Sequence, residues 1–139
     1  MKHFIDISNF ELKKIDSIIQ KAKQIKKNPK KFSNKCKYKT LGMIFQKDST
    51  RTRASFTVGF QKLGGNTLEL NTKSIGFGKR ESAEDILRTL AQYIDILVIR
   101  NDDHELLKKL SALNVLPIIN GLSDISHPCQ ILSDMLTIN

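Results

Sequence analysis

Five consecutive residues, Ser49-Thr50-Arg51-Thr52-Arg53, bring three hydroxyls and two guanidinium groups together. They follow the apolar run 41–45, which is typical of a buried strand, and they precede a segment in which apolar residues recur at helical spacing. The first N–H groups of a helix lack intrahelical partners and carry partial positive charge. Segment 49–53 is therefore predicted to bind an anion, above all a phosphate.

The ordinary alternative is that Ser49 or Thr50 only caps the helix and that both arginines are solvated. The glycine-rich run of a P-loop is absent. Two arginines interleaved with hydroxyls nevertheless favour anion binding, because each guanidinium can contact two phosphate oxygens at once.

The elements around this segment alternate between strands and helices. Apolar strand candidates lie at 41–45, 67–70, 95–99 and 115–119, and segments of helical periodicity separate them. This pattern predicts an α/β fold of three layers, α/β/α, with a parallel sheet of about four strands and helices on both faces. Pro117 favours an edge position for the last strand. Ser8 and Glu11 fit a capping box before a first amphipathic helix.

Composition places the chain among globular proteins. Its 139 residues are 40% hydrophobic and 27% charged, which predicts one domain, 1–139. No apolar run approaches the ~20 residues of a membrane span, and there is no signal-peptide core. Cys36 and Cys129 lack metal-ligand or redox spacing. We expect a cytoplasmic protein with no membrane partner.

The net charge of +9 belongs to residues 1–39, where twelve lysines face three acids. Segment 21–39 could form a nucleic-acid patch. It holds one tyrosine, one phenylalanine and no arginine, whereas nucleic-acid readers favour arginine and stacking aromatics. We interpret it as a solvated face and expect no nucleic-acid partner.

Further polar residues follow the predicted strands. Arg100 comes after the third strand, and His127 and Gln130 come after the fourth. Ligands bind at the carboxyl ends of such strands, so these residues are expected to meet segment 49–53 there. The resulting basic pocket suits a small phosphorylated molecule with a carbonyl to polarise. Neither paired acids nor an evident Ser-His-Asp set is present, although Asp124 lies near His127 in the chain.

Two motifs and one isolated arginine resemble the signatures of the aspartate/ornithine transcarbamylase family. They are Phe45-Gln46-Lys47-Asp48-Ser49-Thr50-Arg51-Thr52-Arg53, Arg100, and Asn120-Gly121-Leu122-Ser123-Asp124-Ile125-Ser126-His127-Pro128-Cys129-Gln130. The lead-in 120–124 and Cys129 follow the ornithine-type pattern, since the aspartate type usually has threonine at the cysteine. The resemblance runs from Phe4 to the end of the chain.

The resemblance implies transfer of a carbamoyl group from carbamoyl phosphate to the δ-amino group of L-ornithine, which gives citrulline and phosphate in arginine biosynthesis. It implies phosphate binding by Ser49, Thr50, Arg51 and Thr52. Arg100 would contact the phosphate and the carbamoyl oxygen, His127 with Thr52 would contact that oxygen, and Gln130 would orient the amide. No cofactor, metal or protein nucleophile is expected.

The sequence departs from the family pattern in two places. Gln46-Lys47-Asp48 stands where Glu-Pro is common, and Asp48 is unfavourable beside a phosphate unless it points away or pairs with Arg53. The loop 71–81, which in the family completes a neighbouring subunit's site, has Gly76 where glutamine is frequent and Arg80 where glycine is usual. Lys79 or Arg80 could replace that contact.

The resemblance also implies a homotrimer and a second, amino-acid-binding domain. The 139 residues would then be the carbamoyl-phosphate half, inactive alone. This half does not decide between an anabolic and a catabolic role. The alternatives are a transcarbamylase for another acceptor, such as aspartate or a modified ornithine, and a nucleic-acid-binding module using segment 21–39.

Overall fold

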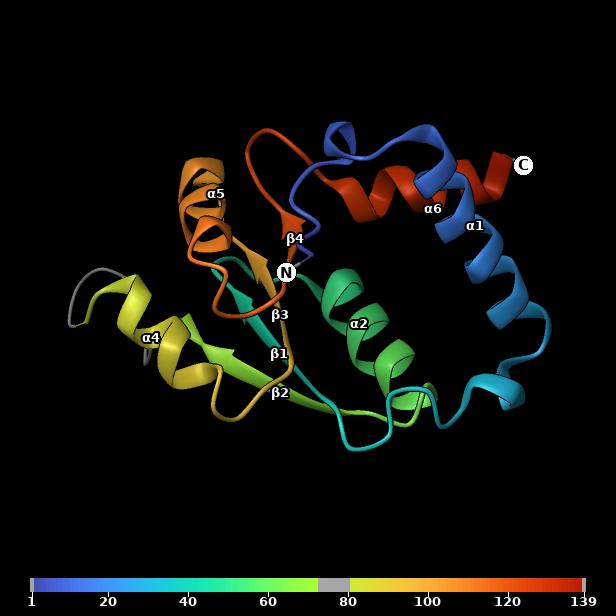
Figure 1. Ribbon diagram of the computed structural model, residues 1–139, viewed down its shortest axis with the longest axis horizontal. Helices are drawn as coiled ribbons and strands as arrows, with labels where there is room; N and C mark the ends of the chain where they lie inside the picture. Colours follow the sequence, from blue (N-terminus) through green and yellow to red (C-terminus); the bar gives the residue numbers. More distant parts are fainter. Residues whose placement is uncertain (1, 73–80, 139) are drawn as a thin grey trace.

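The computed structural model describes residues 2–72 and 81–138. Its centre is a four-stranded parallel sheet in the order β2-β1-β3-β4 (Figure 1). The strands are β1 (Thr40–Phe45), β2 (Asn66–Asn71), β3 (Ile96–Arg100) and β4 (Ile118–Leu122). The helices are α1 (Leu12–Lys27), α2 (Thr50–Lys62), α4 (Ala83–Leu90), α5 (His104–Ala112) and α6 (Pro128–Ile138), with short 3-10 turns at Ile7–Asn9 and Pro29–Phe32.

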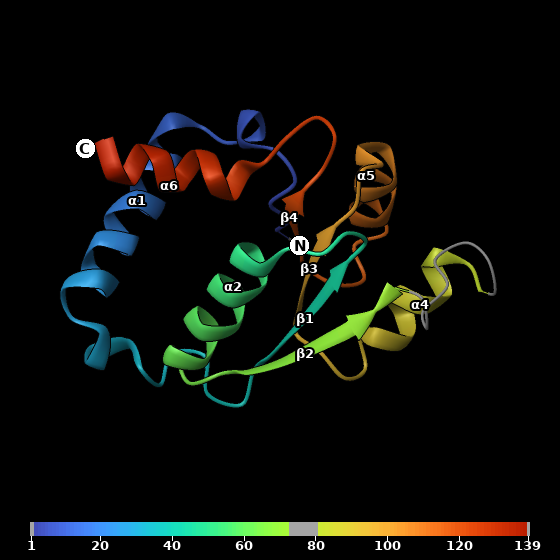
Figure 2. The ribbon, with the colours of Figure 1, turned by 180° about the vertical axis from the view of Figure 1, so that it is seen from behind.

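Helices cover both faces of the sheet, which confirms the predicted three-layer fold. α4 and α5 lie on one side, and α2, α6 and α1 lie on the other, in the views from front and back (Figures 1 and 2). Because all neighbouring strands are parallel, the residues that follow them lie at the same edge of the sheet.

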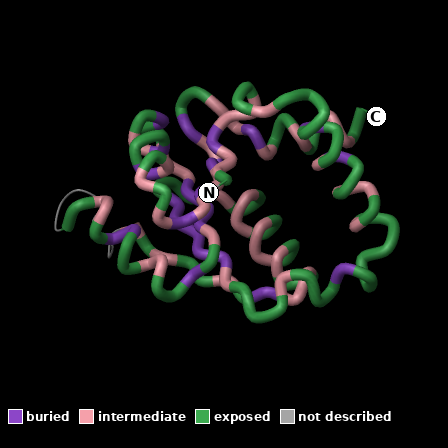
Figure 3. Tube along the Cα trace, in the orientation of Figure 1, coloured by how far each residue is buried: buried purple, intermediate pink, exposed green. Residues whose placement is uncertain are grey.

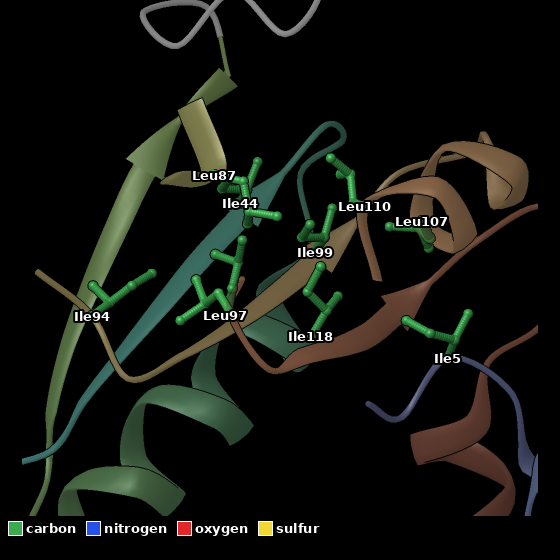
Figure 4. Close-up of a cluster of buried hydrophobic side chains, with 10 residues drawn as sticks. Ile5, Ile44, Leu87, Ile94, Leu97, Ile99, Leu107, Leu110 and Ile118 are labelled. Carbon is green, nitrogen blue, oxygen red and sulfur yellow. The ribbon is translucent and has the colours of Figure 1, made fainter. Parts of the chain in front are cut away.

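The side chains of β1 alternate between the two layers, as a pleated strand requires. Leu41, Met43 and Phe45 join the core beneath α2, together with Phe56 and Phe60 of that helix. Ile44 faces the opposite layer and belongs to a second, larger core there. The buried members of this larger core are Ile5, Ile44, Leu87, Ile94, Leu97, Ile99, Leu107, Leu110, Leu116 and Ile118 (Figure 4). Burial is concentrated on the sheet (Figure 3).

Two local expectations were wrong, and a third was confirmed. The predicted capping box does not form, because Ser8 bonds to Asp6 within a 3-10 turn and the helix begins at Leu12. The last strand spans Ile118–Leu122 and not 115–119, so Asn120 belongs to β4. Pro117 precedes that strand, which lies at the edge of the sheet as expected.

The lysine-rich segment 21–39 lies mostly exposed along the end of α1 and the connector to β1. The Lys21 ammonium lies 5.7 Å from the centre of the Phe32 ring, and Lys37 lies 4.8 Å from that of Tyr38. In the part of the chain that the structure describes, no helix is long and apolar enough to cross a membrane.

Candidate functional site

The first turn of α2 presents backbone donors at the edge of the sheet. Ser49 is the N-cap in extended conformation, and its hydroxyl makes no capping hydrogen bond. The N–H of Arg53 is the first to bond back, to the carbonyl of Ser49 at 3.1 Å. The N–H groups of residues 50–52 lie before that point and have no intrahelical acceptor. An anion placed here would receive those donors together with the positive end of the helix dipole.

The two arginines of this turn have different surroundings. The Arg53 guanidinium lies 2.8 Å from Glu69 on β2, 3.5 Å from Asp48 and 5.3 Å from the centre of the Phe45 ring. Its Nε is within ion-pair distance of Glu69 but lacks hydrogen-bond geometry. Arg51 is exposed and has no carboxylate partner among the described residues. Arg51 is therefore the arginine of this turn that remains available to an anion.

Asp48 does not oppose that role. Its side chain is fully exposed and pairs with Arg53 and not with Arg51. Because Arg53 offsets the charge of Asp48, this acid is tolerable beside a phosphate site.

A cavity of about 210 Å³ lies between the first turns of α2 and α6. Its walls come from both helices: Arg51, Thr52, Ser55, Phe56, His127, Cys129, Gln130 and Ser133. The structure thus brings four of the residues singled out from the sequence to one cavity, namely Arg51, Thr52, His127 and Gln130. Ser49 and Thr50 stand at the start of α2 but do not line it. Sequence reasoning missed Ser55, Phe56 and Ser133, which repeat Arg51, Thr52 and Cys129 at the i+4 spacing of a helix face.

Arg100 does not line this cavity but lies close to it. It is the last residue of β3 and stands opposite Phe45, the last residue of β1, in the parallel register. Its charge acts on His127, whose pKa it helps to lower. Among the described residues Arg100 has no carboxylate partner, so its guanidinium is also available to an anion.

His127 is held as a neutral imidazole. Burial is the main cause that lowers its pKa, the positive charge of Arg100 lowers it further, and Asp134 opposes both. Its Nδ1 is buried without a hydrogen-bond partner. At neutral pH the ring therefore carries one proton, which it can donate to a carbonyl oxygen in the cavity.

The surroundings of three further polar residues in segment 124–130 restrict the chemistry that they can perform. Burial raises the pKa of Cys129 to about 11, so this thiol is not a nucleophile at neutral pH. The Gln130 amide nitrogen donates to Asp134 at 2.8 Å. Asp124 accepts from the backbone N–H of His104 at 3.3 Å, so it is directed toward α5. Asp124 and His127 therefore do not form a Ser-His-Asp arrangement with any serine among the described residues.

A larger cavity of about 410 Å³ lies at the ends of β1 and β2, and its lining includes Asp48, Arg53 and Glu69. Because Arg53 already pairs with both acids, this cavity suits an anion less well than the smaller cavity does. Within the described ranges 2–72 and 81–138, no group of three His, Cys, Asp or Glu side chains could hold a metal ion. Gly76, Lys79 and Arg80 lie outside the described residues.

Residues 2–139 match the carbamoyl-P binding domain of the aspartate/ornithine carbamoyltransferase family, and the chain belongs to this family. Within it, the similarity is to ornithine carbamoyltransferases. The chain is 43% identical to the enzyme of Methanococcus aeolicus over 136 residues. These aligned residues cover 98% of this chain and 44% of that protein.

Solved structures agree with this assignment. The anabolic ornithine carbamoyltransferase of Campylobacter jejuni is 36% identical with a TM-score of 0.92, over 99% of this chain and 45% of that one. A mutant N-acetyl-L-ornithine transcarbamylase, complexed with carbamyl phosphate and N-succinyl-L-norvaline, is 26% identical with a TM-score of 0.89, over 99% and 47%. The chain spans less than half the length of these relatives.

Proposed function

We propose that this chain is the carbamoyl-phosphate half of an ornithine carbamoyltransferase. The protein would transfer the carbamoyl group of carbamoyl phosphate to the δ-amino group of L-ornithine and release L-citrulline and phosphate, as a step of arginine biosynthesis. The observation that carries the proposal is the cavity where the unpaired Arg51 and the neutral His127 meet. The ornithine enzymes among its relatives support the acceptor.

Each residue of the site would serve one part of the substrate. The phosphate would lie at the first turn of α2, on the backbone donors there and on Ser49, Thr50, Arg51 and Thr52. Arg100 would contact the phosphate and the carbamoyl oxygen. His127, with Thr52, would donate to that oxygen, and Gln130 would orient the carbamoyl amide.

The chemistry needs only fixed donors and alignment. The ornithine amine attacks the carbonyl carbon, a C–N bond forms, and the bond between that carbon and the bridging phosphate oxygen breaks. The departing phosphate takes up the proton that the amine loses. Negative charge grows first on the carbonyl oxygen and then on the departing phosphate. A neutral His127 and two free guanidinium groups are donors for both, and such donors typically contribute about 10²–10³ in rate each. Holding the two substrates together lowers the barrier further.

Other parts of the proposal follow from family membership. The ornithine site would belong to a second domain outside these 139 residues. We expect a cytoplasmic homotrimer in which Lys79 or Arg80 of the 71–81 loop completes a neighbouring site in place of the usual glutamine. Sedimentation equilibrium of the full-length gene product tests the trimer.

The decisive experiment is calorimetric titration of the full-length gene product with carbamoyl phosphate and with inorganic phosphate. Arg51→Ala should lose at least about tenfold in affinity for both, because a hydrogen bond to a charged group contributes about 1.5–3 kcal/mol. Lys62→Ala is the matched control, since it removes a positive charge from the other end of α2. Equal affinity in wild type and Arg51→Ala would reject the site.

A transcarbamylase for a modified ornithine is the second candidate, favoured by the similarity to the N-acetyl-L-ornithine transcarbamylase. Product formation should be assayed with L-ornithine, N-acetyl-L-ornithine and L-aspartate in parallel. We expect turnover with L-ornithine. Turnover confined to either of the others would keep the carbamoyl-phosphate site and replace the acceptor.

A further inference from the structure

Three polar residues are buried beneath the loop that leads into α6. His104 is 3% exposed, Asn120 is 0% exposed and Ser123 is 6% exposed. They come from the first turn of α5, from β4 and from the loop after β4, respectively. Because a buried polar group is costly without a hydrogen bond, their contacts identify what holds this loop in place.

The Ser123 hydroxyl is the centre of the cluster. Its Oγ lies 2.7 Å from Nδ1 of His104 and accepts from the backbone N–H of Ser126 at 3.2 Å. Nδ2 of Asn120 lies 3.3 Å from the same oxygen and donates to the carbonyl of Ile5 at 3.0 Å and to that of Ser126 at 3.2 Å. The loop is thereby closed on itself and attached to the N-terminal segment.

The ring of His104 and the hydroxyl of Ser123 form a short hydrogen bond of 2.7 Å. The hydroxyl has a second acceptor within reach, the carbonyl of Ser126 at 3.2 Å. The bond forms with either tautomer of the ring, because Nδ1 can accept the hydroxyl proton or donate its own proton to the hydroxyl oxygen. The contact between the ring and the loop therefore does not depend on which atom carries the proton.

Backbone hydrogen bonds beside this cluster connect the two loops that adjoin Arg100 and His127. The N–H of Asn101 donates to the backbone carbonyl of Leu122 at 3.1 Å, and the N–H of Asp124 donates to the backbone carbonyl of Asp102 at 3.2 Å. The first of these loops begins directly after Arg100, and the second ends at His127. His104 lies between them and bonds to the second through both its backbone and its ring.

We infer that His104 is a positioning residue for the carbamoyl-phosphate site. Its ring is hydrogen-bonded to the Ser123 hydroxyl and so holds the 123–127 loop, and with it His127, against the loop that follows Arg100. The inference rests on the proposed function. Misplacing a contacting group by about 1 Å can cost about 10² in rate, so a residue that never touches the substrate can control it.

The first test is the contact between His104 and Ser123, measured by ¹⁵N NMR on the labelled full-length gene product, with the ring signals assigned by their loss in His104→Asn. The Nδ1 signal is expected to shift in Ser123→Ala, because that variant removes the hydroxyl. An Nδ1 signal that does not change would overturn the contact. This measurement does not depend on activity.

The second test compares two replacements of His104. Asparagine can place a hydrogen-bonding amide near the position of Nδ1, whereas leucine has no hydrogen-bonding group. We expect His104→Leu to lower kcat/KM for carbamoyl phosphate by at least about tenfold, with His104→Asn within about threefold of wild type. Ser123→Ala should resemble His104→Leu, and Ser111→Ala, which removes a hydroxyl bonded only within α5, should resemble wild type.

The outcomes separate the two proposals. If His104→Leu does not fold, Ser123→Ala alone decides, since it removes the same hydrogen bond with a smaller change. Values within about twofold of wild type in both variants would overturn the role of His104 while wild-type turnover preserved the proposed function. A wild-type protein that neither binds nor uses carbamoyl phosphate would overturn the proposed function and the role of His104 together.

Discussion

The Nε atom of Arg53 lies 2.8 Å from Oε1 of Glu69, and this ion pair ties the first turn of α2 to β2. Arg51, two residues earlier on the same turn, lines the cavity toward α6 and has no carboxylate partner among the described residues. Two arginines of one motif therefore have different surroundings, one within the fold and one open to a ligand.

Arg53→Ala should lower stability more than Arg51→Ala does. It removes a partly exposed ion pair, which contributes about 0–1 kcal/mol, and the contact with the Phe45 ring, which contributes about 0.5–1 kcal/mol. Thermal unfolding of both variants measures the difference. Glu69→Gln is the matched control, because it breaks the ion pair but leaves the ring contact in place. A lower midpoint for Arg51→Ala than for Arg53→Ala would contradict the assignment.

His127 should titrate below its ordinary pKa, and the variants should move that pKa in opposite directions. Asp134→Asn should lower it further, and Arg100→Ala should raise it. It should remain below the ordinary value in Arg100→Ala, because burial is the larger cause. NMR titration of the ring protons measures all three proteins. An elevated pKa in wild type would show that the ring is not desolvated.

The same depressed pKa gives the sign of a stability effect. The unfolded chain binds a proton at His127 near pH 6.5, whereas the folded chain binds it only at lower pH. The contribution of His127 is therefore fully present above about pH 6.5 and is lost as pH falls through the lowered folded pKa. His127→Gln should flatten the dependence of urea unfolding on pH in that window. An unchanged slope in the variant would be evidence against the lowered pKa.

Cys129 should react slowly with iodoacetamide at pH 8. With a pKa of about 11, about one thiol in a thousand is ionised at that pH, and the thiolate is the reactive form. Cys36→Ser isolates the reaction of Cys129, and the same variant unfolded in urea gives the unhindered rate. Bound carbamoyl phosphate should slow the reaction further, because Cys129 lines the cavity. Equal rates in the folded and unfolded protein would show that the thiol is not buried.

Two glycines should respond to alanine in opposite ways. Gly59 lies on α2 with nothing within 4 Å of an added Cβ, so Gly59→Ala should stabilise by up to about 1 kcal/mol. Gly64 has a φ of +90°, and an added Cβ would meet the carbonyl oxygen of Ser33, so Gly64→Ala should destabilise by more than that. Urea unfolding of the pair measures both, and a stabilised Gly64→Ala would contradict the backbone conformation.

Local features of the fold could be predicted wherever the signal lies within a few residues. Ser82 and Asp103 cap α4 and α5 through their side chains, and Pro128 is the first residue of α6, a position that favours proline. Ile131 lies on the apolar side of α6 by its helical spacing, yet it is 39% exposed. The helical period identifies the apolar side of α6 but does not say how completely other parts of the protein cover it.

The sequence by itself determined the alternation of strands and helices, the parallel sheet and the motifs that follow its strands, because periodicity and strand-end motifs are properties of neighbouring residues. Tertiary structure alone decided which arginine is bound to Glu69, that Asp124 is directed toward α5, and that His104 lies against Ser123. Each of these contacts joins different elements, so its geometry depends on how strands and loops distant in the chain pack against one another.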